Sequence, residues 1–314
     1  MQPDYNNKKS IRTAIGEELV ELGKDNGNIV VLDADLSGST KTSIFAKAYP
    51  ERFFNEGIAE QDLITTAVGL SLTGKIPFAA TFAIFATGRT YDQIRNSACY
   101  QNANIKIIGA HGGITVGEDG ASHQALEDVS LMRSLPNMTV ITPCDYEQAR
   151  QAVDYAFEID GPVYIRSSRV DVPCIYDKNY KFNKGKAVIL KEGSDVSVFS
   201  TGDIFSEALK AVLLLEEKGI NAELINIPVI KPLDKLSVIS SVKKTKLAVT
   251  VENHSVIGGL GSAVAECLSE DFPAKLIRIG VNDEFGQSGK PDELLKYYKL
   301  DGESIANRIL EIKK

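Results

Sequence analysis

The sequence is poor in the residues that build metal centres and disulfide frameworks. It holds three histidines and four cysteines, and no two cysteines form a C-x-x-C pair. Because zinc sites need several closely spaced His, Cys or carboxylate ligands, we expect no metal site built from His and Cys. The wide spacing of the cysteines, with no recognisable signal peptide, indicates the reducing cytoplasm. The residues concerned are His111, His123, His254, Cys99, Cys144, Cys174 and Cys267.

Positive charge and long apolar runs are also scarce. The chain has 35 Lys and Arg against 42 Asp and Glu, which gives a formal net charge of −7. This balance argues against electrostatically driven binding to nucleic acid, although a local basic pocket for a phosphate remains possible. No apolar stretch is long enough for a membrane span. We therefore expect small-molecule or protein partners, with no nucleic acid and no membrane.

Several catalytic signatures are missing as well. The sequence contains no G-x-S-x-G elbow, no H-E-x-x-H pair and no P-loop. Serine hydrolases, zinc proteases and ordinary NTPases therefore become poor hypotheses. No G-x-G-x-x-G fingerprint follows the first predicted strand, which disfavours a plain nucleotide-binding module.

What the chain does contain is a long alternation of strands and helices. Its 314 residues are 43% hydrophobic and 25% charged, a composition typical of a globular protein with two domains. A helix is expected from Ser10, whose hydroxyl can cap it, and further helices from about Gln124, at 146–157 and around Tyr91 to Cys99. Strands are expected at 28–32, 76–82, 104–110, 138–142 and 163–166. Such alternation predicts a mostly parallel sheet covered by helices.

A second alternating series follows a Pro-, Tyr- and Lys-containing stretch. Its predicted strands are 195–200, 222–227, 246–251 and 275–279, and its predicted helices are 204–218, 234–242, 260–268 and 291–298. We therefore predict an α/β protein with two doubly wound, mostly parallel-sheet domains. The predicted boundaries are a first domain at 1–172, a linker at 173–186 and a smaller domain at 187–314.

The stretch from Phe53 to Asp62 draws attention because of Glu60. Glu60 lies where a predicted strand gives way to a helix, and the ten residues 63–72 after it are apolar on nearly all faces. An acid in a first helical turn is ordinarily explained by the helix dipole. A carboxylate near a core is costly unless it has a partner or a function.

Ligands in open α/β sheets gather beyond the carboxyl ends of the strands, so the loops there are the places to search. Taken alone, Phe82 and Phe85 could be core aromatics, and the glycine-rich loop 111–123 could be a structural turn. Together these loops hold acids, aromatics, histidines and an arginine. The residues are Asp35, Ser39, Glu60, Phe82, Phe85, His111, Asp119, His123 and Arg169.

Several ordered motifs give this sequence a resemblance to a known family. From about Ile11 to the C-terminus, the chain resembles the second half of transketolase, and the match rests on motifs in the family's order and spacing. They are GIAEQ at 57–61, TFAIF at 81–85, YDQIR at 91–95, VGEDGASHQALED at 116–128, KPLD at 231–234, VENH at 251–254, GGLG at 258–261 and SGKP at 288–291.

The resemblance implies a thiamine-diphosphate enzyme that moves a two-carbon ketol unit between sugar phosphates. Glu60 matches the family's catalytic glutamate, which hydrogen-bonds the aminopyrimidine ring of the cofactor in a dry site. Phe82 and Phe85 match the aromatics that flank this ring, where flat apolar faces suit it. Asp35 is similar to an aspartate near the cofactor. Gly88 is a departure, because some transketolases have a further aromatic there.

The resemblance also implies substrate contacts. Arg12, Ser39, His111 and Arg169 match positions that bind the sugar phosphate, and such residues suit a dianion. Asp119 and His123 match residues that contact the sugar hydroxyls near the scissile bond. A histidine titrates near neutral pH, so His123 is the candidate proton shuttle and a second catalytic residue with Glu60. His254 matches a small-domain position, for which a structural or interface role is the preferred interpretation.

The largest departure from the family is the lack of any Gly-Asp-Gly motif. In transketolases this motif belongs to a preceding domain of about 300 residues, which holds the diphosphate through Mg²⁺ or Ca²⁺. Since the chain starts at its own Met1, we expect it to be one subunit of a split transketolase. A second subunit would carry the Gly-Asp-Gly motif and the metal ion, and two copies of each chain would form a heterotetramer. We predict no metal ligands in this chain.

Other interpretations stay open at this point. The chain could belong to a split transketolase for a sulfosugar or branched-sugar phosphate. It could also be the beta subunit of a 2-oxo acid dehydrogenase or half of a deoxyxylulose-phosphate synthase, although His111, His123 and Arg169 favour sugar phosphates. A non-catalytic scaffold is a further alternative, against which an intact Glu60 speaks.

Overall fold

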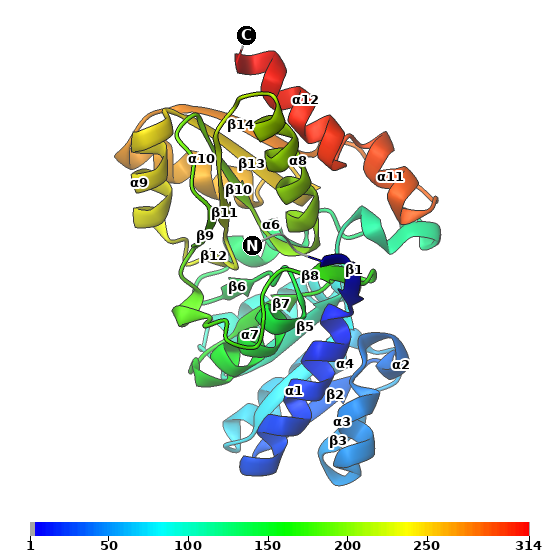
Figure 1. The fold of residues 1–314 in the computed structure, drawn as a ribbon. Helices are drawn as coiled ribbons and strands as arrows, with labels where there is room; N and C mark the ends of the chain where they lie inside the picture. Colours follow the sequence, from blue (N-terminus) through cyan, green and yellow to red (C-terminus); the bar gives the residue numbers. More distant parts are fainter. Residues whose placement is uncertain (1–3, 314) are drawn as a thin grey trace.

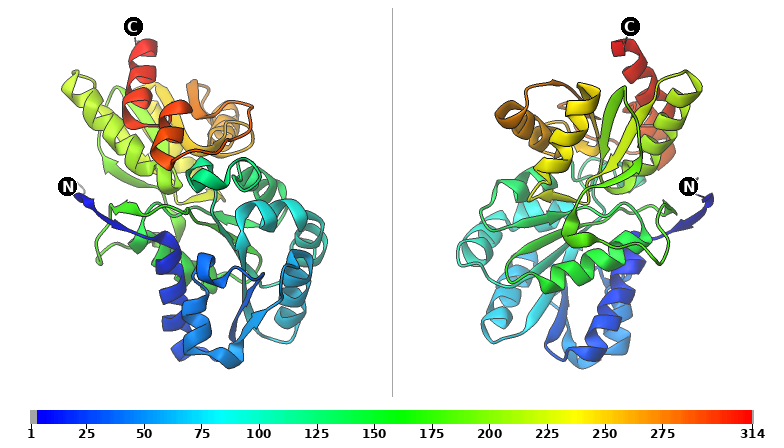
Figure 2. Two further views of the ribbon diagram at one scale, coloured as in Figure 1. Left: turned by 90° about the vertical axis from the view of Figure 1, so that its right-hand side faces the viewer. Right: turned by 60° about the vertical axis from the view of Figure 1, so that its left-hand side comes forward.

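The computed structural model describes residues 4–313 and arranges them as two α/β units (Figure 1). The larger unit contains a seven-stranded sheet and the smaller a five-stranded sheet. Helices lie on both faces of each of these sheets (Figure 2). The predicted α/β class with two doubly wound units is therefore confirmed.

The larger sheet has the strand order β12-β6-β7-β5-β4-β2-β3, and only the β12–β6 pair is antiparallel. Its central strands are buried along nearly their whole length, as expected for parallel strands between two helical layers. The strands are β2 (Ile29–Asp33), β3 (Phe53–Asn55), β4 (Ile76–Phe82), β5 (Lys106–Ala110), β6 (Thr139–Ile141), β7 (Val163–Arg166) and β12 (Val229–Lys231).

Two helical layers cover this sheet. On one face, α1 (Ile11–Asp25) and α7 (Tyr146–Glu158) pack over β2, β4, β5 and β7. On the other lie α4 (Glu60–Leu72), α6 (Asp128–Ser134) and two π-helical segments at 85–89 and 94–99. Helix α1 begins where predicted, because Ser10 Oγ accepts a hydrogen bond from the N–H of Thr13 at 3.2 Å. Three short helices, α2 (Ser37–Thr40), α3 (Ser43–Ala48) and α5 (Tyr91–Gln93), complete this unit.

The smaller sheet has the order β14-β13-β10-β11-β9, with β9 antiparallel to its neighbour. Helices α8 and α12 pack on one face and α9 and α10 on the other. The strands are β9 (Val188–Lys191), β10 (Val196–Ser200), β11 (Ala222–Asn226), β13 (Leu247–Ser255) and β14 (Lys275–Val281). The helices are α8 (Phe205–Glu217), α9 (Lys235–Thr245), α10 (Leu260–Asp271), α11 (Pro291–Tyr297) and α12 (Gly302–Lys313).

The two units share structure across their border. Strand β12 follows β11 in the chain but pairs with β6 of the larger sheet, with Val229 opposite Ile141. One apolar cluster also continues from α4 and α6 of the larger unit into α9 and α10 of the smaller. Loops at this border are therefore held by side chains from both units.

The segment predicted as a linker, 173–186, packs against the larger unit. Its first residues belong to β8 (Val172–Cys174), which pairs with β1 (Asp4–Lys9) beside the border of the two units (Figure 2). The carboxylate of Asp145 accepts hydrogen bonds from the N–H groups of Ile175 and Tyr176 at 2.8 and 2.7 Å. Phe182 is buried beside α7. The segment is thus an ordered connection, and the predicted boundaries at 172 and 186 stay predictions.

Most predicted helices and strands are present. Among the differences, the short elements β1, β8, β9, β12, α2 and α3 were not predicted, and the helix predicted around Tyr91 to Cys99 is the short α5 followed by a π-helical segment. The helix predicted from Gln124 begins at Asp128, because loop residues 124–126 are tied to neighbouring backbone. The final helix, α12, was not predicted. Residues 63–72 of α4 were expected to be apolar on nearly all faces and close to the core, but Thr65, Gly69 and Leu72 are exposed. Within residues 4–313, no helix has the length and apolar character that a membrane span requires.

Candidate active site

The candidate site lies at the carboxyl edge of the larger sheet. Phe82 ends β4, His111 directly follows β5, and Arg169 lies three residues after β7. Because β4, β5 and β7 are parallel neighbours, their carboxyl ends meet at one edge. The fold thereby gathers side chains that lie up to 87 residues apart in the sequence.

Two phenylalanines and two histidines form an aromatic cluster at this edge. The rings of Phe82 and Phe85 are stacked with centroids 6.0 Å apart, and His111 lies 4.0 Å from Phe82. His123 meets Phe85 edge-on at 5.4 Å. The structure thus brings together four of the residues predicted for the site, with flat apolar faces beside two imidazoles.

His111 is held in an unusual state. It has the left-handed backbone conformation, with φ of 62°, and its Nδ1 is buried without a hydrogen-bond partner in residues 4–313. Burial first, and then the positive charges of Arg12 and Arg169, lower its pKa to about 3. We expected His111 among the cations for a phosphate; instead the imidazole is neutral at physiological pH, and its free nitrogen is available to a ligand.

A second cluster is built around two arginines. The guanidinium of Arg12 donates to the carbonyl oxygens of Ser39 and Arg169, both at 2.6 Å. Arg169 in turn donates to the carbonyl oxygen of Val116 at 2.6 Å and to the carboxylate of Asp119 at 3.1 Å. Four predicted substrate residues, Arg12, Ser39, Asp119 and Arg169, therefore lie in one connected group next to His111.

The turn that carries Ser39 is shaped by a buried acid that sequence analysis did not single out. Asp33, at the end of β2, accepts hydrogen bonds from the hydroxyls of Thr40 and Thr42 at 2.7 and 2.8 Å. It also accepts from the N–H of Leu36. Burial raises the pKa of Asp33, and these hydrogen bonds oppose that shift. Asp33 thus fixes the turn that places Ser39 against Arg12.

Glu60 lies where the sequence indicated, at the first position of α4, with its side chain 6% exposed. Its Oε1 accepts a hydrogen bond from Nη1 of Arg89 at 2.9 Å. The same guanidinium lies over the ring of Phe85, 4.2 Å from its centroid. Arg89 therefore connects the buried acid to the aromatic cluster. We did not predict it, although an arginine four residues after Phe85 was a visible signal.

Two residues discussed from the sequence are less closely connected to these clusters. Asp35 is exposed, and its carboxylate accepts a hydrogen bond from Nδ2 of Asn55 at 3.1 Å. Gly88 lies exposed in the π-helical segment 85–89, with no atom within 4 Å of the place where a side chain would begin. A π-helix carries an extra residue in its turn and is frequent at functional sites. In the described residues, no group of three His, Cys, Asp or Glu side chains could hold a metal ion.

Comparisons with known families decide which proteins share this arrangement. The family model for the transketolase pyrimidine binding domain matches residues 7–173, and that for the transketolase C-terminal domain matches residues 185–305. The chain belongs to the transketolase family. The resemblance stated from the motifs is therefore confirmed.

Individual relatives cover nearly the whole length of this transketolase-family chain. A protein of Methanocaldococcus jannaschii named "Putative transketolase C-terminal section" is 53% identical over 96% of both chains. The 6-deoxy-6-sulfo-D-fructose transketolase subunit SqwH of a Clostridium species is 42% identical, with 96% of this chain and 94% of that protein covered. A solved structure described as a split gene transketolase, an inactive beta4 tetramer, superposes with a TM-score of 0.90 at 51% identity, covering 96% of this chain and 97% of that one.

Proposed function

We propose that this chain is the C-terminal subunit of a two-subunit, thiamine-diphosphate-dependent transketolase. The observation that carries the proposal is the joining of Glu60, Phe82, Phe85, His111 and His123 at one edge of the sheet, next to two arginines. The reaction would be transfer of a two-carbon ketol unit from a ketose phosphate to an aldose phosphate, as in the pentose phosphate pathway.

The residues present fit the cofactor's aminopyrimidine ring. Phe82 and Phe85 offer stacked apolar faces, and Glu60 is an enclosed acid able to share a proton with a ring nitrogen. The unpartnered Nδ1 of His111 offers one more polar contact in the same cluster. When bound, thiamine diphosphate supplies a nucleophilic carbon for ketol transfer, while the chain orients the ring and excludes water. Asp35, which is exposed beside Asn55, is the weakest member of the proposed set.

The arginine group fits the charged end of the substrate. Arg12 and Arg169 supply fixed positive charge beside Ser39, which suits a phosphate dianion or a sulfonate. Neutral His111 would donate or accept one hydrogen bond there without adding charge. Asp119 and His123 would contact sugar hydroxyls, and His123 would move a proton between substrate oxygen and solvent.

The diphosphate and its ion are assigned to a partner subunit. This chain has no Gly-Asp-Gly motif, and we propose that an N-terminal subunit carries that motif with Mg²⁺ or Ca²⁺. Relatives named as a C-terminal section and as split-gene products support a divided enzyme. Two copies of each chain, in the cytoplasm, are the proposed assembly. The exposed face of α4, beginning beside Glu60, is the proposed contact with a neighbouring chain.

A second candidate concerns the sugar. The relative from Clostridium is named for a sulfonated sugar, and a sulfonate is a tetrahedral anion that two arginines can bind as they bind a phosphate, although it carries less charge. We therefore propose specialisation for an unusual sugar as the alternative substrate within the same reaction. A 2-oxo acid dehydrogenase beta subunit is disfavoured, because both family models that match are those of transketolase.

Reconstitution tests the proposal. The natural partner subunit is co-purified, thiamine diphosphate and magnesium are added, and ketose donors are screened against aldose acceptors. Xylulose 5-phosphate with ribose 5-phosphate is the expected pair, and 6-deoxy-6-sulfo-D-fructose tests the alternative. The isolated chain should be inactive. Full activity without a partner would overturn the two-subunit proposal, and normal turnover in a Glu60→Gln complex would favour a scaffold role.

A further inference from the structure

The glycine-rich loop 111–123, together with Gln124 and Ala125 after it, is held from the smaller unit. The loop carries His111, Asp119 and His123, and its segment 114–119 contacts β13 of the smaller sheet. At Gly113 the backbone has φ of 80°, and a side chain there would overlap the amide of Asn253 on β13. Glycine is required at that point because the loop backbone lies directly against Asn253.

The side-chain amide of Asn253 binds two residues of this loop and one carboxylate of the smaller unit. Its Oδ1 accepts a hydrogen bond from the N–H of Ile114 at 2.9 Å, and its Nδ2 donates to Thr115 Oγ1 at 3.0 Å and to Asp203 Oδ2 at 2.9 Å. Thr115 also donates to that carboxylate at 2.7 Å. Asn253 is 2% exposed, so these partners cannot be replaced by water without cost.

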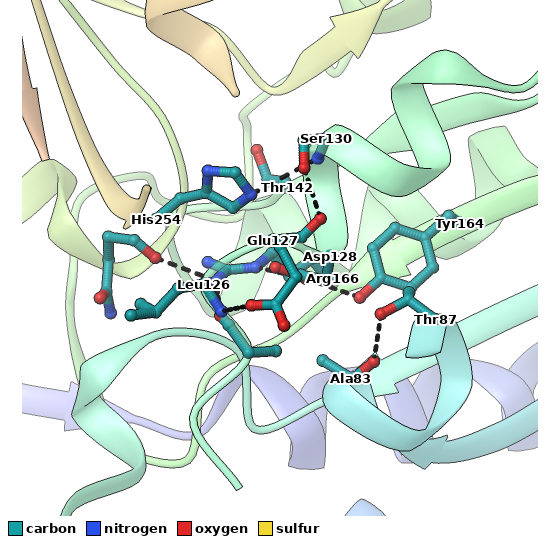
Figure 3. Close-up of polar contacts among 12 residues, drawn as sticks. Ala83, Thr87, Leu126, Glu127, Asp128, Ser130, Thr142, Tyr164, Arg166 and His254 are labelled. Carbon is teal, nitrogen blue, oxygen red and sulfur yellow. Dashed lines mark hydrogen bonds and ion pairs between the residues drawn. The ribbon is translucent and has the colours of Figure 1, made fainter. Parts of the chain in front are cut away.

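The other end of the loop is tied to the same place. Nη2 of Arg166 donates to the carbonyl oxygens of Ala125 at 3.2 Å and of Asn253 at 3.0 Å. The N–H of Gly113 donates to the same Ala125 oxygen at 2.9 Å. Arg166 itself is aimed at Asp128, with Tyr164 beside it, as Figure 3 shows. Both ends of the loop are thus fixed within one buried polar group.

From this geometry we infer that Asn253 is a positioning residue for ketol transfer, supplied by the smaller unit. The side chain of Asn253 hydrogen-bonds to Ile114, Thr115 and Asp203. It therefore acts by holding the loop that carries His111, Asp119 and His123. The inference rests on the proposed function, since the loop residues matter for transfer only if they contact the sugar.

The test uses the reconstituted two-subunit complex with Asn253→Ala. We expect kcat/KM for ketol transfer to fall about 10- to 100-fold, since displacement of reacting groups by about 1 Å has effects of this size. The dissociation constant of thiamine diphosphate should change less than this, because Glu60, Phe82 and Phe85 lie outside the loop and His111 alone of the proposed ring contacts lies on it. Lys231→Met is the matched control: it removes a contact to the carbonyl oxygens of Arg133 and Leu135 at the same border but leaves the loop alone.

Exchanging the amide of Asn253 with the carboxylate of Asp203 distinguishes a positioning role of Asn253 from a general contribution to stability. Asn253→Asp sets two carboxylates against each other and should impair transfer, whereas Asn253→Asp with Asp203→Asn restores an amide–carboxylate pair and should recover most activity. If the Ala variant does not fold, Thr115→Val removes the loop's side-chain contacts to Asn253 and Asp203 and leaves the Ile114 N–H bond in place. Equal losses in Asn253→Ala and Lys231→Met, or full activity in Asn253→Ala, would overturn the inference. An inactive wild-type complex would instead refute the proposed function.

Discussion

Two acid–arginine pairs in this chain differ in how completely the protein encloses them. Asp128 and Arg166 have side chains 0% and 7% exposed and meet at 2.7 Å, and Tyr164 donates to the same carboxylate oxygen at 2.7 Å. Glu60 is equally hidden at 6%, but its partner Arg89 is 53% exposed. Both side chains of the Asp128–Arg166 pair are buried, and we call it the closed pair. In the Glu60–Arg89 pair the acid is buried but the arginine reaches solvent, and we call it the open pair.

The difference separates a structural pair from a pair at the candidate active site. Burial raises the pKa of Asp128, but the interactions with Arg166 and His254 and the hydrogen bonds from Arg166 and Tyr164 together outweigh this effect, and the pKa lies below its usual value. The acid is therefore held ionised between the two units. Glu60 pairs with the long, half-exposed side chain of Arg89. A ligand could displace this side chain at small cost, because an exposed arginine regains water when it leaves. An enclosed acid with a displaceable partner is suited to binding a ligand.

Breaking the closed pair should have the largest effect on stability. Arg166→Met leaves Asp128 buried without its cation, so the free energy of unfolding of the chain should fall by about 3–5 kcal/mol. Urea denaturation followed by circular dichroism measures this. The double variant with Asp128→Asn should recover part of the loss, and a decrease below about 1 kcal/mol would place this pair among ordinary surface pairs.

Replacing the acid of the open pair, Glu60, should reduce ketol transfer and leave stability nearly unchanged. Glu60→Gln keeps the size of the side chain and an oxygen for Arg89, so the free energy of unfolding should change by less than about 1 kcal/mol. Ketol transfer by the reconstituted complex should fall at least about 100-fold, which corresponds to about 2.7 kcal/mol, because proton sharing with the cofactor ring is lost. A stability loss as large as that of Arg166→Met would mean that Glu60 is a structural acid.

The stability of the region around the Asp128–Arg166 pair should also depend on pH through His254, which lies beside Ser130 above this pair (Figure 3). Its Nδ1 donates to the carbonyl oxygen of Ser255 at 2.7 Å, and its Nε2 accepts from the N–H of Ser130 at 3.4 Å. Burial first lowers its pKa to about 4; nearby Asp128 opposes this and Arg166 adds to it.

The direction of the pH effect follows from this shift. An unfolded histidine titrates near pH 6.5, so between about pH 6.5 and 4 the unfolded chain binds a proton that folded His254 does not. Its share of the free energy of unfolding is lost as pH falls, by about 2 kcal/mol at pH 5. Glu252 acts oppositely, because burial raises its pKa to about 7. Comparing wild type with His254→Gln isolates the histidine, and parallel pH profiles would contradict the expectation.

The smallest effect is expected from the exposed arginine. Arg89→Met should change the free energy of unfolding by less than about 1 kcal/mol, since water can take the place of the 53% exposed guanidinium beside the Glu60 carboxylate. Thermal unfolding of the variant beside Arg166→Met gives the direct comparison. A change of several kcal/mol in Arg89→Met would show that the open pair is as structural as the closed one.

Much of the fold could be predicted because its signals are local. The apolar strands 29–33 and 76–82 and the capped helix at Ser10 follow from residues within a few positions of each other. Helix α4 shows where such reasoning ends: its run 63–72 is largely apolar, yet Thr65, Gly69 and Leu72 are exposed, because neighbouring elements decide which face is covered.

The sequence by itself determined the α/β class, the transketolase motifs and the residue types of the site, including Glu60, Phe82 and Phe85. Only the tertiary structure decided that Arg89 meets Glu60 across 29 residues and that Asn253 meets Ile114 across 139. It also decided that His111 is neutral, because burial and the approach of Arg12 and Arg169 set its pKa. Periodicity and spacing act over a few residues, whereas charge and burial depend on neighbours that folding alone brings together.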